Sequence, residues 1–197
     1  MLELDPIGFR LANASKPGDP MAVGGNWPSM GMREVLQALE DHPAWQERER
    51  ARSEGRGVGI AIGGWPGGTE PAAAACSLEN DGTLQVRISS VDLTGTNTGL
   101  AMLAAEAYGV EPDRVRIVTG ATSSGPFPGS TGGSKIHYTV GPAVLEAAEE
   151  ARRQTLELAA QRFEAAPADL EIRDGKVQVK GAPDRAVPLA KIAASTM

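Results

Sequence analysis

The sequence is poor in cysteine, histidine and aromatic residues, and each shortage excludes a class of protein. Cys76 is the only cysteine among 197 residues, so no internal disulfide framework can form and a reducing compartment is expected. Two histidines and one cysteine leave no cluster with metal-ligand spacing, so we expect no metal site made by the protein itself. Aromatic residues make up only 4% of the chain, and the core must therefore consist mainly of alanine, valine, leucine and isoleucine.

Positive charge and long apolar runs are also scarce. The formal net charge is −6 and the sequence pI is near 5.0, with no basic stripe, which argues against a nucleic-acid partner. No stretch approaches the roughly 18 apolar residues of a membrane-spanning helix, and the first residues lack the pattern of a signal peptide. We therefore expect a soluble, cytoplasmic protein with no membrane partner.

Composition divides the chain into a connector of helical patterns and loops over residues 1–55 and an α+β lobe over residues 56–197. In the connector, Asp5 is expected to cap a helix over residues 6–13, with a proline in its first turn. Two further helical patterns follow over residues 29–39 and 43–53.

The lobe mixes hairpins with strand–helix units. Turn residues at 80–82 and at 174–175 each join two segments of alternating apolar residues, which predicts two antiparallel hairpins. Two βα crossovers are also expected, so the pattern favours an α+β fold over an all-parallel doubly wound sheet. The expected strands cover residues 58–62, 72–79, 83–91, 114–118, 168–172 and 176–179, and the expected helices cover residues 98–108, 141–163 and 188–194.

Two loops rich in glycine, serine and threonine, residues 94–98 and 130–135, each lead directly into a helical pattern. A helix start presents unpaired backbone N–H groups and a positive dipole end, and glycine lets an anionic group approach the backbone. Two such loops in one domain suggest a cradle for an extended, phosphate-bearing ligand, with Lys135 offsetting its charge. The alternatives are an ordinary N-cap for the first loop and a flexible turn for the second.

A third glycine-rich loop, residues 63–68, contains Trp65 among four glycines. Trp65 either forms a wall of a substrate pocket or covers the end of a sheet, and the sequence favours neither. His42 is expected to be solvated, and His137 is expected to pack or cap rather than to act as a general base. Cys76 lies in an apolar run and is expected to be a buried, inert thiol.

Five segments of the chain, taken in order, carry a resemblance to a known family. They are DPIGFRLANA, RGVGIAIGGW, LTGTNTGLAMLAAEAYGVEPDRVRIVTGAT, PFPGSTGGSKIHYTVGPAVLEAA and LEIRDGKVQVKG. Together they resemble the molybdenum-cofactor-binding subunit of the xanthine dehydrogenase and aldehyde oxidase family, which includes the large chain of aerobic carbon monoxide dehydrogenase. The resemblance covers nearly the whole chain from Asp5.

The resemblance implies a molybdopterin cofactor that carries molybdenum, often as the cytosine dinucleotide in bacteria, with no cysteine ligand from the protein. It implies oxidative hydroxylation of an N-heterocycle, an aldehyde or a related small molecule. Electrons would leave through iron–sulfur and flavin (FAD) partners, and the remainder of the molybdenum subunit would be a further partner.

Residue by residue, the resemblance assigns a first cofactor loop, a second cofactor loop and a loop lining the substrate pocket. The family's glutamine in the first cofactor loop falls on Thr94 and the preceding glycine on Leu93, so the glutamine amide is missing here. The assigned residues are Thr94, Gly95 and Thr96 for the first cofactor loop, Gly132, Gly133 and Ser134 for the second, and Gly64 and Trp65 for the substrate pocket.

The resemblance places the family's catalytic glutamate beyond Met197, so no residue of this chain is assigned as catalytic. We therefore expect part of a molybdenum hydroxylase large subunit, inactive alone and self-associating through surfaces that the whole subunit would bury. The rival interpretation is a non-catalytic interaction module that keeps the fold without the cofactor. The change at Thr94 supports that rival.

Overall fold

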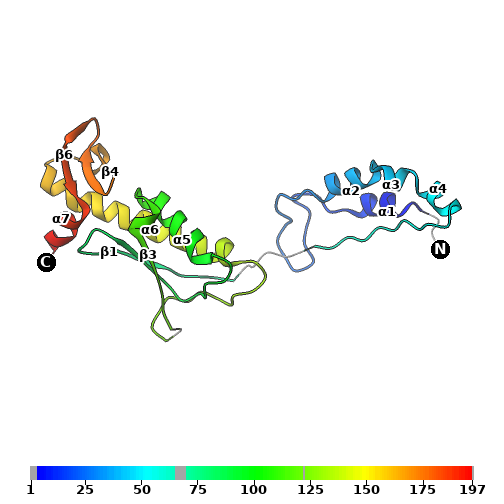
Figure 1. Ribbon diagram of the computed structural model, residues 1–197, viewed down its shortest axis with the longest axis horizontal. Helices are drawn as coiled ribbons and strands as arrows, with labels where there is room; N and C mark the ends of the chain where they lie inside the picture. Colours follow the sequence, from blue (N-terminus) through cyan, green and yellow to red (C-terminus); the bar gives the residue numbers. More distant parts are fainter. Residues whose placement is uncertain (1–3, 65–69, 122, 197) are drawn as a thin grey trace. The chain divides into compact units, whose positions relative to one another are not determined.

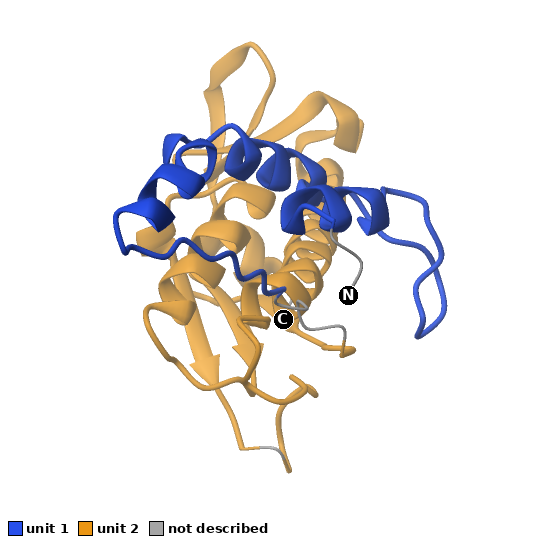
Figure 2. Ribbon diagram, turned by 90° about the vertical axis from the view of Figure 1, so that its right-hand side faces the viewer, with its two compact units in different colours: residues 1–64 blue, residues 65–197 orange. Residues whose placement is uncertain are grey.

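The computed structural model describes residues 4–64, 70–121 and 123–196. Packing of the backbone divides the chain into two compact units, Met1–Gly64 and Trp65–Met197 (Figure 2). The first unit is built from helices and loops, and the second contains two small sheets and the longest helix (Figure 1).

Residues 4–64, the described part of the first unit, form four helices. Asp5 caps the first of them, because its Oδ1 atom accepts hydrogen bonds from the backbone N–H groups of Ile7 at 2.9 Å and Gly8 at 2.8 Å. The predicted helix over residues 6–13 and its cap are thereby confirmed. The helices are α1 (Pro6–Asn13), α2 (Met32–Glu40), α3 (Pro43–Gln46) and α4 (Arg48–Ser53).

A small apolar core holds this unit together. Ile7 of α1, Leu36 of α2 and Trp45 of α3 are all buried. Arg48 contacts the residues at the start of α1 and in α3. Its Nη2 atom lies 3.0 Å from Asp5 Oδ2, and its guanidinium lies 4.5 Å from the Trp45 ring centroid. One arginine therefore joins the start of α1 to the junction between α3 and α4.

The strand expected at residues 58–62 is wrong. Residues 56–64 have no regular secondary structure and pair with no strand among the described residues. Val58 and Ile60 instead line a cavity of about 210 Å³ together with Trp45. Alternating apolar residues are not sufficient for a strand, because its backbone groups must also pair with those of a neighbour.

The first sheet of the second unit contains the expected hairpin and one parallel strand. In the hairpin turn, Asp81 Oδ1 accepts a hydrogen bond from the Thr83 N–H at 2.9 Å, and Gly82 has a φ of +83°. Helix α5 (Thr96–Tyr108) then crosses over, so that the third strand lies parallel to the second. The strands, in their order across the sheet, are β1 (Ala75–Leu78), β2 (Leu84–Ile88) and β3 (Val115–Thr119).

Helix α6 (Ile136–Phe163) follows and begins earlier than the expected start at residue 141, so Pro142 lies inside it. The prediction of a second βα crossover is wrong, because the strand that follows α6 belongs to a separate sheet. That sheet includes a strand the sequence did not predict, since two prolines and two charged residues obscure it at the sheet edge. The elements are β4 (Leu170–Arg173), β5 (Lys176–Val179), β6 (Ala182–Pro188) and α7 (Leu189–Ala193).

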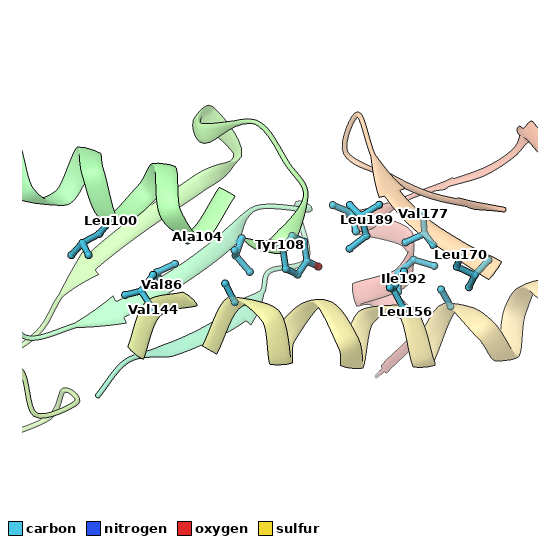
Figure 3. Close-up of a cluster of buried hydrophobic side chains, with 14 of the residues drawn as sticks. Val86, Leu100, Ala104, Tyr108, Val144, Leu156, Leu170, Val177, Leu189 and Ile192 are labelled. Atoms are coloured by element: carbon cyan, nitrogen blue, oxygen red, sulfur yellow. The ribbon is translucent and has the colours of Figure 1, made fainter. Parts of the chain in front are cut away.

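One apolar core runs the length of α6. Figure 3 shows buried side chains above this helix, with Val86, Leu100 and Val144 toward one end and Leu170 and Ile192 toward the other. Helix α5 packs along α6 over the first sheet. The fold class is therefore α+β, as predicted, and both helices pack against the first sheet.

A buried hydrogen bond joins α5 to α6 within this core. The Tyr108 side chain is fully buried, and its hydroxyl lies 2.8 Å from Thr155 Oγ1. Thr155 Oγ1 donates to the Ala151 carbonyl at 2.8 Å, so the Tyr108 hydroxyl is the donor to Thr155. Burial raises the pKa of the Tyr108 phenol to about 12.

We expect Tyr108→Phe to lower the free energy of unfolding by about 1 kcal/mol near neutral pH, because one buried hydrogen bond is lost. The raised pKa gives a second signature: stability is retained below about pH 10, where an unfolded tyrosine titrates, and falls as pH rises toward 12. The variant should lose less stability over that range. Urea unfolding near neutral pH and near pH 12 measures the loss of stability for each variant. Tyr138→Phe, at an exposed site, is the control. Equal alkaline losses in the two variants would contradict the assignment.

Candidate functional site

The loop between β2 and α5 has an unusual backbone at its end. Thr94 has a φ of +55° and Gly95 a φ of +81°, a region that β-branched residues rarely adopt. The Thr94 and Thr96 hydroxyls both donate to the Leu93 carbonyl, at 2.7 and 2.6 Å. Because each hydroxyl has one proton, these oxygens face any ligand as hydrogen-bond acceptors.

A simple capping role does not account for this loop. Asp92 Oδ1 accepts a hydrogen bond from the Asn97 N–H at 3.0 Å, so an aspartate earlier in this loop caps α5. Gly95 occupies the N-cap position and makes no side-chain cap bond. Asn97 Oδ1 is buried and has no hydrogen-bond partner among the described residues. The side-chain oxygens of Thr94, Thr96 and Asn97 therefore take no part in capping α5.

The second loop leads into the first turn of α6. Gly133 has a φ of +66° and Ser134 a φ of +56°. A Cβ atom built on Gly132 or on Gly133 meets no other atom within 4 Å. The space beside both glycines is therefore open, as close approach of a ligand to the backbone requires.

The two loops meet at one cavity. Its volume is about 440 Å³, and it lies at the first turns of α5 and α6. Four of the six residues assigned to cofactor loops line it, and Gly95 and Gly133 are their neighbours in the chain. The lining residues are Leu93, Thr94, Thr96, Thr131, Gly132, Ser134, Lys135, Ile136 and His137.

His137 connects the two loops, in agreement with the expectation that it packs rather than acts as a base. Its Nε2 atom lies 3.1 Å from the Thr96 carbonyl oxygen. A Cβ atom on Gly99 would overlap the imidazole ring, with His137 Cε1 only 2.8 Å away. The absence of a side chain at Gly99 therefore lets the first turn of α6 contact the first turn of α5.

Lys135 has a different role from the one expected. Its side chain is buried and forms an ion pair with Glu70, so its charge already has a partner within the chain. Hydrogen bonds from Lys135 and from Ser130 lower the pKa of the Glu70 carboxyl to about 2. The expected offset of ligand charge by Lys135 is therefore not what the structure shows, and sequence reasoning missed Glu70.

The structure does not test the two residues assigned to the substrate pocket. Gly64 is the last residue of the first unit, whereas the cavity between the loops belongs to the second unit. Trp65 lies outside the described residues. Their assignment stays a prediction.

Other site types find little support in the part of the chain that the structure describes. Within it, no three histidine, cysteine, aspartate or glutamate side chains gather as a metal site. Burial raises the pKa of the Cys76 thiol to about 11, so the thiol is protonated and unreactive at neutral pH. None of the described helices combines the length and apolarity needed to span a bilayer.

Comparison with known proteins identifies the family. The chain matches the family model of the molybdopterin cofactor-binding domain over residues 35–197. The chain belongs to this family. Both loops of the cavity lie within the matched residues, and the resemblance predicted from the sequence is confirmed.

Three relatives illustrate the likeness. The chain is 32% identical over 160 residues to the xanthine dehydrogenase molybdenum-binding subunit of Escherichia coli O157:H7, covering 75% of this chain and 21% of that protein. It is 29% identical over 161 residues to the aldehyde oxidoreductase of Megalodesulfovibrio gigas, covering 75% of this chain and 18% of that protein. The reconstituted CO dehydrogenase from Oligotropha carboxidovorans shares the fold, with a TM-score of 0.70 and 20% identity over 98% of this chain and 28% of that chain. The chain thus spans about a fifth of the length of its curated relatives.

The contact between Gly99 and His137 makes the effect of one substitution depend on another. In a His137→Ala background, we expect Gly99→Ala to raise the free energy of unfolding by about 0.5–1 kcal/mol, because alanine favours a helix over glycine. With His137 present, the new methyl group displaces the ring from Thr96, and that gain should be lost. Urea unfolding of the two single variants and the double variant measures the difference. The same effect in both backgrounds would mean that the ring does not pack on Gly99.

Proposed function

We propose that the cavity between the two loops binds a molybdopterin, and that the chain is the cofactor-holding part of a molybdenum hydroxylase. The observation that carries this proposal is the meeting of both loops at one cavity, in a chain of the molybdopterin cofactor-binding family. Either loop alone would be an ordinary connection into a helix. Together they offer glycine backbone and hydroxyl oxygens on one wall.

The residues of the cavity fit such a cofactor. Gly132 and Gly133 leave the backbone open to close approach. The Thr94 and Thr96 hydroxyls donate to the Leu93 carbonyl, so their oxygens remain as acceptors that would suit the N–H groups of a pterin.

A bound molybdopterin supplies the molybdenum centre at which a substrate loses two electrons. The chain binds and orients this group, and Leu93 and Ile136 add apolar surface that excludes water from part of the cavity. Thr94 stands where the resemblance expects a glutamine, and its hydroxyl donates a hydrogen bond to the Leu93 carbonyl. Orientation by this loop therefore depends on oxygen acceptors and on the backbone rather than on a side-chain amide.

The reaction we propose for the whole protein is oxidative hydroxylation of an N-heterocycle, an aldehyde or a related small molecule. Its partners would be the rest of the molybdenum subunit and iron–sulfur and flavin (FAD) subunits, with the cofactor as molybdopterin or its cytosine dinucleotide. The names of the relatives, a xanthine dehydrogenase subunit and an aldehyde oxidoreductase, support this reaction class. Gly64 and Trp65 are the residues we propose for a substrate pocket.

Cofactor content tests the proposal directly. The chain is produced in a host that makes molybdenum cofactor, and in the same host with cofactor synthesis blocked. We expect molybdenum and a fluorescent oxidised pterin to copurify only from the first host, each in near-stoichiometric amount. Protein without metal or pterin from both hosts would favour the rival interpretation of a non-catalytic interaction module.

Gly132→Val should lower bound molybdenum by about tenfold or more, because the valine side chain would occupy the space that the cofactor needs. The stability of the cofactor-free chain should change little, since a Cβ at Gly132 meets no atom within 4 Å. Gly57→Val is the matched control, as Gly57 has equally open surroundings but does not line the cavity. Elemental analysis and thermal unfolding give the two readouts. Equal molybdenum in both variants would exclude the second loop from the site.

A further inference from the structure

A buried ion pair borders the cavity, and the proposed cofactor contacts do not use it. The Lys135 side chain is 3% exposed, and its ammonium pairs with the carboxylate of Glu70, whose side chain is 49% exposed. Loss of the ion pair should therefore be more unfavourable for Lys135 than for Glu70. A buried ammonium without a counter-ion is strongly disfavoured, whereas water can solvate a half-exposed carboxylate.

The Glu70 carboxylate also holds the second loop at Ser130. It accepts a hydrogen bond from the Ser130 N–H at 2.7 Å and another from the Ser130 hydroxyl at 3.1 Å. Close by in the chain, the Ala73 N–H donates to the Phe127 carbonyl at 2.7 Å. The segment after residue 69 is thus attached to the loop at three positions along it: Phe127, Ser130 and Lys135.

Gly129 allows this attachment to form. Its φ is +66°, and a Cβ atom there would lie 2.6 Å from Glu70 Oε2 and 2.7 Å from Lys135 Nζ. Any side chain at this position would be strained and would also push the two charged groups apart. The loop therefore combines a counter-ion, two hydrogen bonds and one glycine around a single carboxylate.

We propose that Glu70 is a positioning residue for the second cofactor loop. By holding Ser130 and Lys135, its carboxylate keeps Gly132 and Ser134 at the cavity wall before any ligand is bound. The inference rests on the proposed function, because that function assigns the loop to the cofactor. Since Glu70 neutralises Lys135, the loop meets its ligand with backbone groups and hydroxyls rather than with an unpaired ammonium.

The first test measures the loop in the cofactor-free chain by amide hydrogen exchange over residues 127–135. Glu70→Gln should raise exchange there by about tenfold or more, because it leaves a buried charge unpaired. Lys135→Met should raise the exchange rate less than Glu70→Gln does. The double variant, Glu70→Gln with Lys135→Met, should exchange more slowly than Glu70→Gln alone, since no unpaired charge remains. Gly129→Ala should raise exchange with both charges intact. Glu149→Gln, which removes an exposed carboxylate of α6, is the matched control and should change nothing.

The second readout is molybdenum content in a host that makes the cofactor. We expect less bound molybdenum in Glu70→Gln than in the unaltered chain, and partial recovery in the double variant. Unchanged exchange in both Glu70→Gln and Gly129→Ala would overturn the proposal, as would an increase spread evenly over the second unit. A looser loop with unchanged molybdenum content would also overturn it. A looser loop in a protein that never binds molybdenum would support the attachment by Glu70 and reject the proposed function instead.

Discussion

The cavity depends on the packing of α5 against α6. Each loop enters the first turn of one of these helices, so the distance between the loops is set by how closely the helices approach. Gly99 and His137 allow contact at the first turns, and the bond from Tyr108 to Thr155 joins the helices again inside the core. A change in this packing at Tyr108 or Thr155 would move both loops at once, although it touches neither.

The electrostatics of the second loop follow from one long-range pair. Sixty-five positions separate Glu70 from Lys135, yet their contact decides which groups the loop can offer a ligand. With the ammonium neutralised inside the protein, the polar groups that line the cavity are backbone groups and threonine and serine hydroxyls. Such groups select a ligand by shape and by its pattern of donors and acceptors, and salt screens them less than it screens an exposed ion pair.

Sequence patterns predicted the elements on which the site is built. Helical spacing and turn residues placed α5, the first hairpin and most of α6, and glycine-rich composition marked both cavity loops. The patterns failed where a contact joins distant segments. Residues 58–62 alternate correctly but pair with no strand in the described part of the chain, and β6 pairs despite its prolines. Glu70 carries no local motif, so only the folded arrangement could connect it with Lys135 and Ser130.

Thr94 and Ser134 also bear on the balance between stability and function. Both have a left-handed backbone that glycine would adopt more easily, at a cost of roughly 1–2 kcal/mol for each side chain. Both line the cavity, one in each loop. A chain selected for stability alone would carry glycine at these two sites. Hydroxyl side chains at these two sites of the cavity wall therefore lower the resistance of the fold to unfolding, a compromise that the proposed binding function would explain.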